Sequence, residues 1–229
     1  MELLADVSPE TVQAVLTDHP YGSTDCHWDK VVDLAAWWKE IDRVTPPNAI
    51  VASFAAQPFA TDLINSNRKN FRYELVWHKA KAVGFLNANR QPLRGHELIM
   101  VFCRQPGKSV YNPQKTPGKP YRITAKSKTT IYRHHKFLPT VNHGDRHPTS
   151  VLALNALGGK RYHPTQKPLL MCEWLVKSYT NAGHLVLDPF AGSATFAVAC
   201  HRTGRRFLGF ERDPEIFKAA VARLKAELQ

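Results

Sequence analysis

The sequence has 229 residues, of which 43% are hydrophobic, and a formal net charge of +12 from 31 basic and 19 acidic residues. This length and composition predict one sizeable core with a small additional lobe, and they exclude a disordered or fibrous protein. No apolar run approaches membrane-spanning length and no basic leader follows Met1, so we expect a cytoplasmic protein without a membrane anchor.

An apolar run at residues 12–17 ends at a turn with the sequence Asp18-His19-Pro20-Tyr21. These four are candidate catalytic residues, because a strand that delivers an acid, a turn and an aromatic ring suits methylation of an exocyclic amine on a base. A carboxylate and a backbone carbonyl accepting the two N–H bonds would aim the nitrogen lone pair, and an aromatic face would hold a flipped base. Asp18, the carbonyl of His19, and Tyr21 fit these roles, although the tetrapeptide alone favours an ordinary loop turn.

The next elements alternate between helix and strand. Residues 29–43 carry apolar side chains at helical spacing, with Trp38 on the apolar face and Trp37 near its edge. Segments rich in β-branched or aromatic residues predict strands at 49–54, 73–77 and 98–102.

A strongly basic stretch then runs from residue 104 to residue 163. It contains twelve Lys or Arg and a single acid, Asp145, so it accounts for +11 of the +12 net charge. Its interleaved aromatic residues and weak periodicity predict an irregular lobe that contacts nucleic acid, although a solvated loop could carry the same charge. The candidate nucleic-acid contacts in this lobe are Lys115, Lys119, Arg122, Lys126, Lys128, Arg133 and Lys136.

Strand and helix alternate again after the lobe. The predicted segments are helices at 169–179 and 196–202, and strands at 185–187 and 207–210. The last helix has Asp213 as its N-cap and Pro214 at its first position. Alternation of this kind predicts an α/β fold with a mostly parallel sheet.

The strand at 185–187 leads into a turn of small residues, Asp188-Pro189-Phe190-Ala191-Gly192-Ser193-Ala194-Thr195. At the carboxyl end of a parallel strand, such a turn forms a ligand crevice and lets a ligand approach the backbone. Glu211 follows at the end of the next strand, where a carboxylate can accept hydrogen bonds from ribose hydroxyls. The pattern favours an adenosine-type ligand without distinguishing a dinucleotide from S-adenosylmethionine, and an ordinary turn capped by Ser193 is the structural alternative.

The four cysteines, Cys26, Cys103, Cys172 and Cys200, form no CxxC pair. Paired cysteines at that spacing are the usual signature of a structural zinc site. We therefore expect free thiols in a reducing compartment and no metal site.

Several motifs, taken in order, resemble those of the amino-group DNA methyltransferases with the permuted, beta-type motif order, a family with bacterial and phage members. The matching segments are Asp18-His19-Pro20-Tyr21, the basic stretch, His163-Pro164-Thr165-Gln166-Lys167-Pro168, and Asp188 to Thr195. The similarity extends over nearly the whole chain, including Trp77-His78-Lys79 and residues 92–97, and four motifs in the right order make it highly specific.

The resemblance implies a Rossmann-like sheet with helices on both faces that binds S-adenosylmethionine. It divides the chain into a catalytic half at 1–104, a DNA target-recognition region at 105–160 and a cofactor-binding half at 161–229. Arg94, in the matching segment 92–97, joins the candidate DNA contacts. The implied cofactor-binding residues are Thr165, Lys167, Asp188, Phe190, Ala191, Gly192, Ser193, Thr195 and Glu211.

Family members with Asp at the first catalytic position mostly methylate N6 of adenine, so we expect a site-specific adenine methyltransferase acting on double-stranded DNA. Members often form homodimers, and some act beside a cognate restriction nuclease, so the resemblance allows both as partners. A degenerate member that binds DNA without methylating it is the main alternative. A protein or RNA methyltransferase usually has the two motifs in the opposite order, and a nicotinamide enzyme would leave the Asp18 turn unexplained.

Three departures from the family pattern bear on activity. His19 replaces a Pro whose ring restricts φ, so we expect reduced but nonzero activity. Ala194 replaces a Gly, which costs about 1 kcal/mol or more if that position requires a positive φ. Family members also carry a Gly-Asp pair just upstream of the segment that matches Met1–Leu4. A longer chain including that acid is expected to bind the cofactor more tightly.

Overall fold

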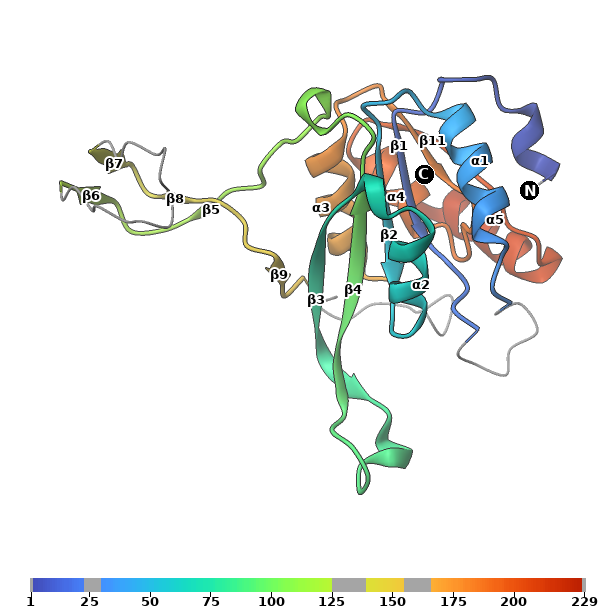
Figure 1. The fold of residues 1–229 in the computed structure, drawn as a ribbon, viewed down its shortest axis with the longest axis horizontal. Helices are drawn as coiled ribbons and strands as arrows, with labels where there is room; N and C mark the ends of the chain where they lie inside the picture. The colour runs from blue at the N-terminus through green and yellow to red at the C-terminus, as the bar shows by residue number, and fades with distance from the viewer. Residues whose placement is uncertain (1, 23–29, 125–138, 155–165, 228–229) are drawn as a thin grey trace. The chain divides into compact units, whose positions relative to one another are not determined.

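The computed structural model describes residues 2–22, 30–124, 139–154 and 166–227 (Figure 1). These residues form two compact units, one of Met1–Asn112 with Ser150–Gln229 and a smaller one of Pro113–Thr149. The smaller unit lies within the predicted target-recognition region at 105–160. Within the described part of the chain, no helix is both long and apolar enough to cross a membrane.

The larger unit is built on a sheet that, in the described residues, has seven strands in the order β11-β10-β1-β2-β4-β3-β9. The first four of these run parallel, whereas β4 runs antiparallel to both β2 and β3. The strand bounds are β1 (Ala14–Asp18), β2 (Ile50–Ala55), β3 (Phe71–Val83), β4 (Arg94–Phe102), β9 (Val151–Leu152), β10 (Leu185–Asp188) and β11 (Arg206–Gly209).

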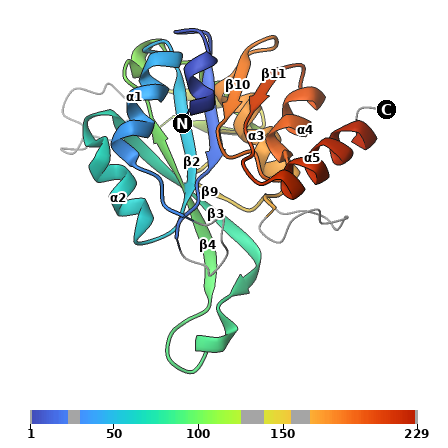
Figure 2. The same ribbon diagram turned by 90° about the vertical axis from the view of Figure 1, so that its right-hand side faces the viewer.

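Helices cover both faces of this sheet (Figure 2). The side chains of β1 alternate between the faces, so that Leu16 packs in a core with α3 and α4, and Val15 packs in a second core with α1 and α2. Helix α5 packs on α4 through alanines. The helices are α1 (Leu34–Val44), α2 (Phe59–Ser66), α3 (Leu169–Tyr179), α4 (Thr195–Arg202) and α5 (Pro214–Glu227), with short 3-10 turns η1 (Glu2–Asp6), η2 (Arg68–Asn70), η3 (Phe85–Asn87) and η4 (Pro106–Lys108).

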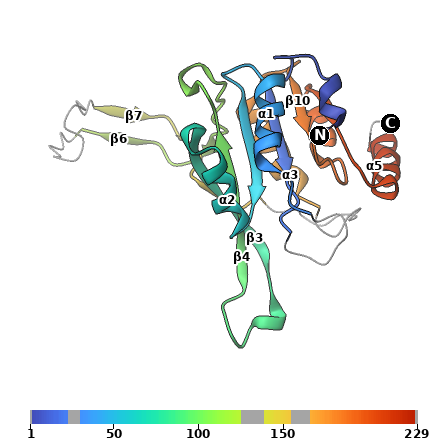
Figure 3. The same ribbon diagram turned by 45° about the vertical axis from the view of Figure 1, so that its right-hand side comes forward.

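The predicted α/β fold with a mostly parallel sheet and helices on both faces is confirmed. Two details differ from the prediction. The first helix begins at Leu34, capped by the Asp33 carboxylate that accepts from the amides of Ala35 and Ala36, and Trp37 as well as Trp38 is buried. The strands predicted at 73–77 and 98–102 extend to 71–83 and 94–102, forming a long hairpin that projects from the sheet (Figure 3).

The smaller unit, taken by itself, contains two short antiparallel pairs. Strand β5 (Thr116–Pro117) pairs with β8 (Asp145–Arg146), and β6 (Tyr121–Ile123) pairs with β7 (Thr140–Asn142). Gly144, at φ +106, sits where an added Cβ would lie 2.9 Å from the carbonyl oxygen of Gly118. The predicted irregular lobe therefore includes short ribbons that the weak periodicity did not indicate.

Candidate active site

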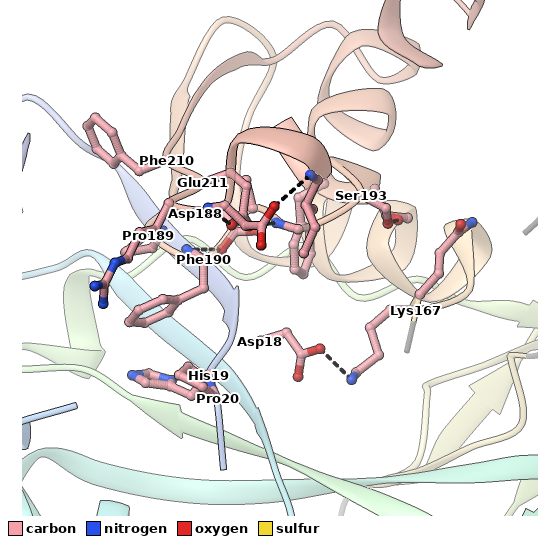
Figure 4. Close-up of a pocket in the computed structure, with 18 of the residues that line it drawn as sticks. Asp18, His19, Pro20, Lys167, Asp188, Pro189, Phe190, Ser193, Phe210 and Glu211 are labelled. Atoms are coloured by element: carbon pink, nitrogen blue, oxygen red, sulfur yellow. Dashed lines mark hydrogen bonds and ion pairs between the residues drawn. The ribbon is translucent and has the colours of Figure 1, made fainter. Parts of the chain in front are cut away.

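The two acidic strand ends singled out in the sequence lie next to each other in the sheet. Strand β1 pairs in parallel with β10, with Val15 opposite Leu187, and the Thr17 hydroxyl donates a 2.6 Å hydrogen bond to the Asp188 carboxylate. Asp18 and Asp188 line one cavity of about 1070 Å³ (Figure 4). Residues 171 positions apart in the chain thus meet at the carboxyl edge of the sheet, where α/β proteins bind ligands.

The turn after β10 is held by backbone hydrogen bonds to the end of β11. The Ala191 amide donates to the Phe210 carbonyl at 2.8 Å, and the Phe210 amide donates to the Asp188 carbonyl at 3.0 Å. Gly192, at φ +49, donates its amide to the Glu211 carboxylate at 2.9 Å. Glu211 is therefore fixed on the turn, and it lines the cavity.

Ala194 caps helix α4 in the left-handed conformation, with φ 57° and ψ 36°. This position is the one where the family pattern has Gly, so the condition for a strain cost of about 1 kcal/mol is met. The turn is supported from below by Arg223 of α5, which is buried and donates to the Ser193 carbonyl at 2.8 Å and to the Thr195 hydroxyl at 3.0 Å. Ser193 itself is not the helix cap.

Burial raises the pKa of Asp188 to about 7, against the opposing effect of hydrogen bonds from the Thr17 hydroxyl and the Phe190 amide. The side chain is almost completely buried, and the neighbouring carboxylates of Asp18 and Glu211 raise its pKa further. A carboxyl group of this kind is stabilised as an anion when a cation enters the cavity.

Lys167 links the Asp18 side of the cavity to the β3–β4 hairpin. Its ammonium nitrogen lies 2.5 Å from Asp18 Oδ2 and 3.4 Å from Glu97 Oε2, and Glu97 also pairs with Lys79. Although burial alone would lower it, the pKa of Lys167 is raised by the carboxylates of Asp18 and Glu97. The pKa of Glu97 is lowered by Lys167 and Lys79, which outweigh its burial. Lys167 and Glu97 are therefore both charged at neutral pH.

His19 is anchored by its side chain as well as by the backbone. The imidazole is buried and packs against Trp37, Phe59 and Phe190 at centroid distances of 4.4, 5.5 and 4.9 Å. Its Nδ1 lies 2.6 Å from the Ser53 hydroxyl, which donates to the Phe54 carbonyl, so Nδ1–H is the donor to Ser53. Burial lowers the pKa of His19 to about 3, so the ring is neutral.

Tyr21 also helps to hold this turn. Its hydroxyl donates a 2.6 Å hydrogen bond to Asp18 Oδ1, and its ring stacks on Phe59 at 5.6 Å. With Lys167 on Oδ2, both carboxylate oxygens of Asp18 have a donor. Asp18 is thus fixed in orientation before any substrate is present.

The structure brings most of the predicted site residues together around the cavity: Asp18, His19, Pro20, Lys167, Asp188, Phe190, Ala191, Gly192, Ser193, Thr195 and Glu211. Thr165 lies outside the described residues. Reasoning from sequence missed the roles of Glu97 and Arg223. Glu97 could have been found because it stands in the segment at 92–97 that resembles the family. Arg223 could have been found from helical spacing, because it lies three residues after Ala220 on the buried side of α5.

In the smaller unit, the predicted DNA contacts are only partly described. Lys115 pairs with Asp145 at 2.5 Å, and both side chains are about half exposed. Arg146 donates to Asn142 and lies over the Tyr121 ring. Lys119 and Arg122 are exposed, as is Arg94 in the larger unit. Lys126, Lys128, Arg133 and Lys136 lie outside the described residues.

Comparison with known proteins identifies the family. Residues 12–222 match the family model N6_N4_Mtase, described as DNA methylase. The chain belongs to this family. Type II methyltransferase M.HpaI of Haemophilus parainfluenzae is 23% identical to this DNA methylase over 246 residues, an alignment that spans 99% of the chain and 72% of the relative.

Solved structures share the fold of this methylase. The crystal structure of the M1.HpyAVI–SAM complex has a TM-score of 0.64 at 22% identity, covering 97% of this chain and 95% of that one. PvuII DNA methyltransferase, which is cytosine-N4-specific, has a TM-score of 0.66 at 15% identity, covering 97% and 82%. These likenesses show the fold, and a fold shared with a cytosine-N4-specific enzyme does not assign the target amine of this chain.

Proposed function

We propose that this DNA methylase transfers a methyl group from S-adenosylmethionine to the exocyclic amine of a base flipped out of double-stranded DNA, with N6 of adenine as the target. The observation that carries the proposal is the single cavity into which both strand ends open, with Asp18 on one side and the Asp188–Thr195 turn on the other. The preference for adenine rests on the resemblance alone, through Asp at the first catalytic position.

The residues of the cavity fit S-adenosylmethionine. Asp188 offers a buried carboxylate without a cationic partner among the described residues, which suits a positively charged ligand. Glu211, held by the Gly192 and Asp213 amides, would accept hydrogen bonds from ribose hydroxyls, and Phe190 would offer an apolar face. When bound, the cofactor supplies an electrophilic methyl group.

Around the target amine, the chain orients the nucleophile and restricts its motion. Asp18 and the carbonyl of His19 accept the two N–H bonds, which directs the nitrogen lone pair toward the methyl group. Lys167 holds the Asp18 carboxylate in place, and Tyr21 has to exchange its hydrogen bond with Asp18 for contact with the base. The charge of Lys119 and Arg122 in the smaller unit suits the phosphate backbone.

A second candidate function is DNA binding with weakened or no methylation, motivated by His19 in place of Pro. The anchoring of the imidazole by Ser53 and three aromatic rings supports the enzyme instead, because the side chain holds the turn in place, although it leaves φ less restricted than a Pro ring would.

Incubating the purified protein with labelled S-adenosylmethionine and bacterial DNA separates these functions. We expect methyl incorporation that is lost in Asp18→Ala while cofactor binding persists. Single-molecule sequencing of DNA from cells expressing the protein then reports the modified base and its sequence context. Incorporation that is absent in the wild type, or unchanged in Asp18→Ala, contradicts the proposed enzyme, and N4-methylcytosine contradicts the choice of adenine.

A further inference from the structure

The β3–β4 hairpin extends well beyond the body of the sheet (Figures 1 and 2). We call its outer part, residues 81–94, the arm. Every residue of the arm is exposed, so neither face of this two-stranded ribbon is buried against the described residues of the larger unit. A hairpin without a covered face gains little stability from its own contacts, which raises the question of what the arm contacts.

The arm lies at the same edge of the sheet as the candidate active site. Asp18 of β1 pairs with Phe54 of β2, and Phe54 pairs with Ile99 of β4, so the residues of β4 before Leu98 continue past the carboxyl ends of β1 and β2. The base of the arm is tied to the catalytic acid through ion pairs that run from Lys79 and Glu97 to Lys167. From Glu97 to Arg94 the strand advances about 10 Å, and the tip lies further out.

Large apolar side chains lie exposed at the tip of the arm and beside it. Phe85 is 81% exposed and Leu86 is 99% exposed, with Val83 and Leu93 about half exposed beside them. The tip is an ordered turn, because Gly84 takes φ +92 and its carbonyl accepts from the Asn87 amide at 3.0 Å. Such a cluster of exposed apolar residues at a fixed position indicates a contact surface.

The chemistry around the apolar tip suits a nucleic acid. Residues 80–96 contain no acid, and Lys81, Arg90 and Arg94 give this segment a positive charge. It also carries the amides Asn87, Asn89 and Gln91, the side-chain type that pairs with the edge of adenine. The major groove of DNA admits a two-stranded β-ribbon, and Phe and Leu are among the side chains that proteins wedge between base steps.

We propose that the arm is a second DNA-contacting element, separate in sequence from the basic lobe. It enters the groove beside the target base and places Phe85 and Leu86 against the base stack, while Arg90 and the amides face base edges and Lys81 and Arg94 face phosphates. This inference rests on the proposed function, because it takes duplex DNA as the substrate. Beyond that function, the inference assigns the arm residues a role in DNA affinity and sequence preference.

The test is the double variant Phe85→Ala with Leu86→Ala, with Phe217→Ala as the matched control. Phe217 is an apolar side chain that is 53% exposed, and it lies on α5, which packs against α4. Binding of a fluorescein-labelled duplex of mixed sequence is followed by anisotropy at several salt concentrations. We expect the double variant to bind about tenfold more weakly with an unchanged salt slope, and Phe217→Ala to bind like the wild type.

A charge variant, Arg90→Gln with Arg94→Gln, gives the complementary result. Removing the phosphate-facing Arg94 together with the base-facing Arg90 is expected to lower the slope of log affinity against log salt concentration by about 1. The apolar variant leaves this slope unchanged. Thermal unfolding and binding of S-adenosylmethionine should match the wild type in all variants, because every substituted side chain of the arm is exposed. A loss of either would mean that the arm is structural and would overturn the proposal.

Two further outcomes overturn it. DNA affinity equal to that of the wild type in the apolar variant removes the arm from the interface. A wild-type dimer that the apolar variant converts to a monomer in sedimentation, with unaltered DNA binding, assigns the tip to a second copy of the chain. In both cases wild-type methylation lost in Asp18→Ala would leave the proposed function standing, whereas a wild type that neither binds nor methylates DNA ends both.

Discussion

Replacing Lys167 with Met tests whether the ion pairs beneath the catalytic acid hold the site together. Methionine is close to lysine in length, so the change removes the charge and leaves little void. The side chain of Lys167 is 9% exposed, that of Glu97 14% and that of Asp18 26%. The variant therefore leaves two carboxylates close together in a largely buried place without the cation between them.

The expected cost follows from these exposures. Removing one partner of a fully buried ion pair costs about 3–5 kcal/mol. Asp18 is a quarter exposed and Glu97 keeps Lys79, so we expect the lower value of about 2–3 kcal/mol. For a protein of this size that corresponds to a drop in Tm of roughly 5–10 °C. Single-turnover methylation, measured well below the Tm, should fall about 10- to 100-fold because Asp18 loses its orientation.

Lys115→Met is the matched control for stability. It makes the same substitution in an ion pair with Asp145 whose side chains are 41% and 46% exposed, and such pairs contribute about 0–1 kcal/mol. Adding Glu97→Gln to Lys167→Met removes one uncompensated carboxylate. The loss in free energy of unfolding in the double variant should therefore be smaller, by at least about 1 kcal/mol, than the sum of the losses in the two single variants. This account of Lys167 would be refuted if Lys167→Met and the control had the same Tm, and if the stability losses of Lys167→Met and Glu97→Gln simply added in the double variant.

Two other predictions concern the acid and the histidine of the cavity. Because burial raises the pKa of Asp188 to about 7, the folded protein retains a proton that the unfolded chain releases near pH 4; the free energy of unfolding should therefore fall as the pH rises from about 4 through 7. Affinity for the cationic cofactor, measured by calorimetry, should rise up to about pH 7 and then level off. If stability and affinity depend on pH in the same way in Asp188→Asn, the titrating group is not Asp188. His19→Pro is expected to raise single-turnover methylation by restricting φ, yet to lower stability by about 2 kcal/mol because the ring packed on Trp37 and bonded to Ser53 is lost. No rise in methylation would refute the role of φ, and an unchanged Tm would refute the anchoring by the ring.

Local sequence was sufficient wherever a signal is carried by neighbours in the chain. Asp213 was predicted as the N-cap of the last helix, and its carboxylate accepts from the Glu215 and Ile216 amides at 2.9 and 3.1 Å. The turn after the strand at 185–187 was predicted from its small residues, and Gly192 does take a positive φ there. Element bounds were less predictable, because the hairpin strands extend past the buried core into residues whose pattern carries no burial signal.

By itself, the sequence determined that Asp18 and Asp188 each end a strand of an α/β sheet, because apolar runs, turn residues and helical periodicity are local properties. Only the tertiary structure decided that β1 lies beside β10, that Lys167 reaches across 149 residues to Asp18, and that Arg223 is buried beneath the Ser193 turn. The physical reason is that a long charged side chain has no preferred partner until the packing of the core removes it from water, and the partner is then whichever opposite charge or carbonyl the fold places within reach.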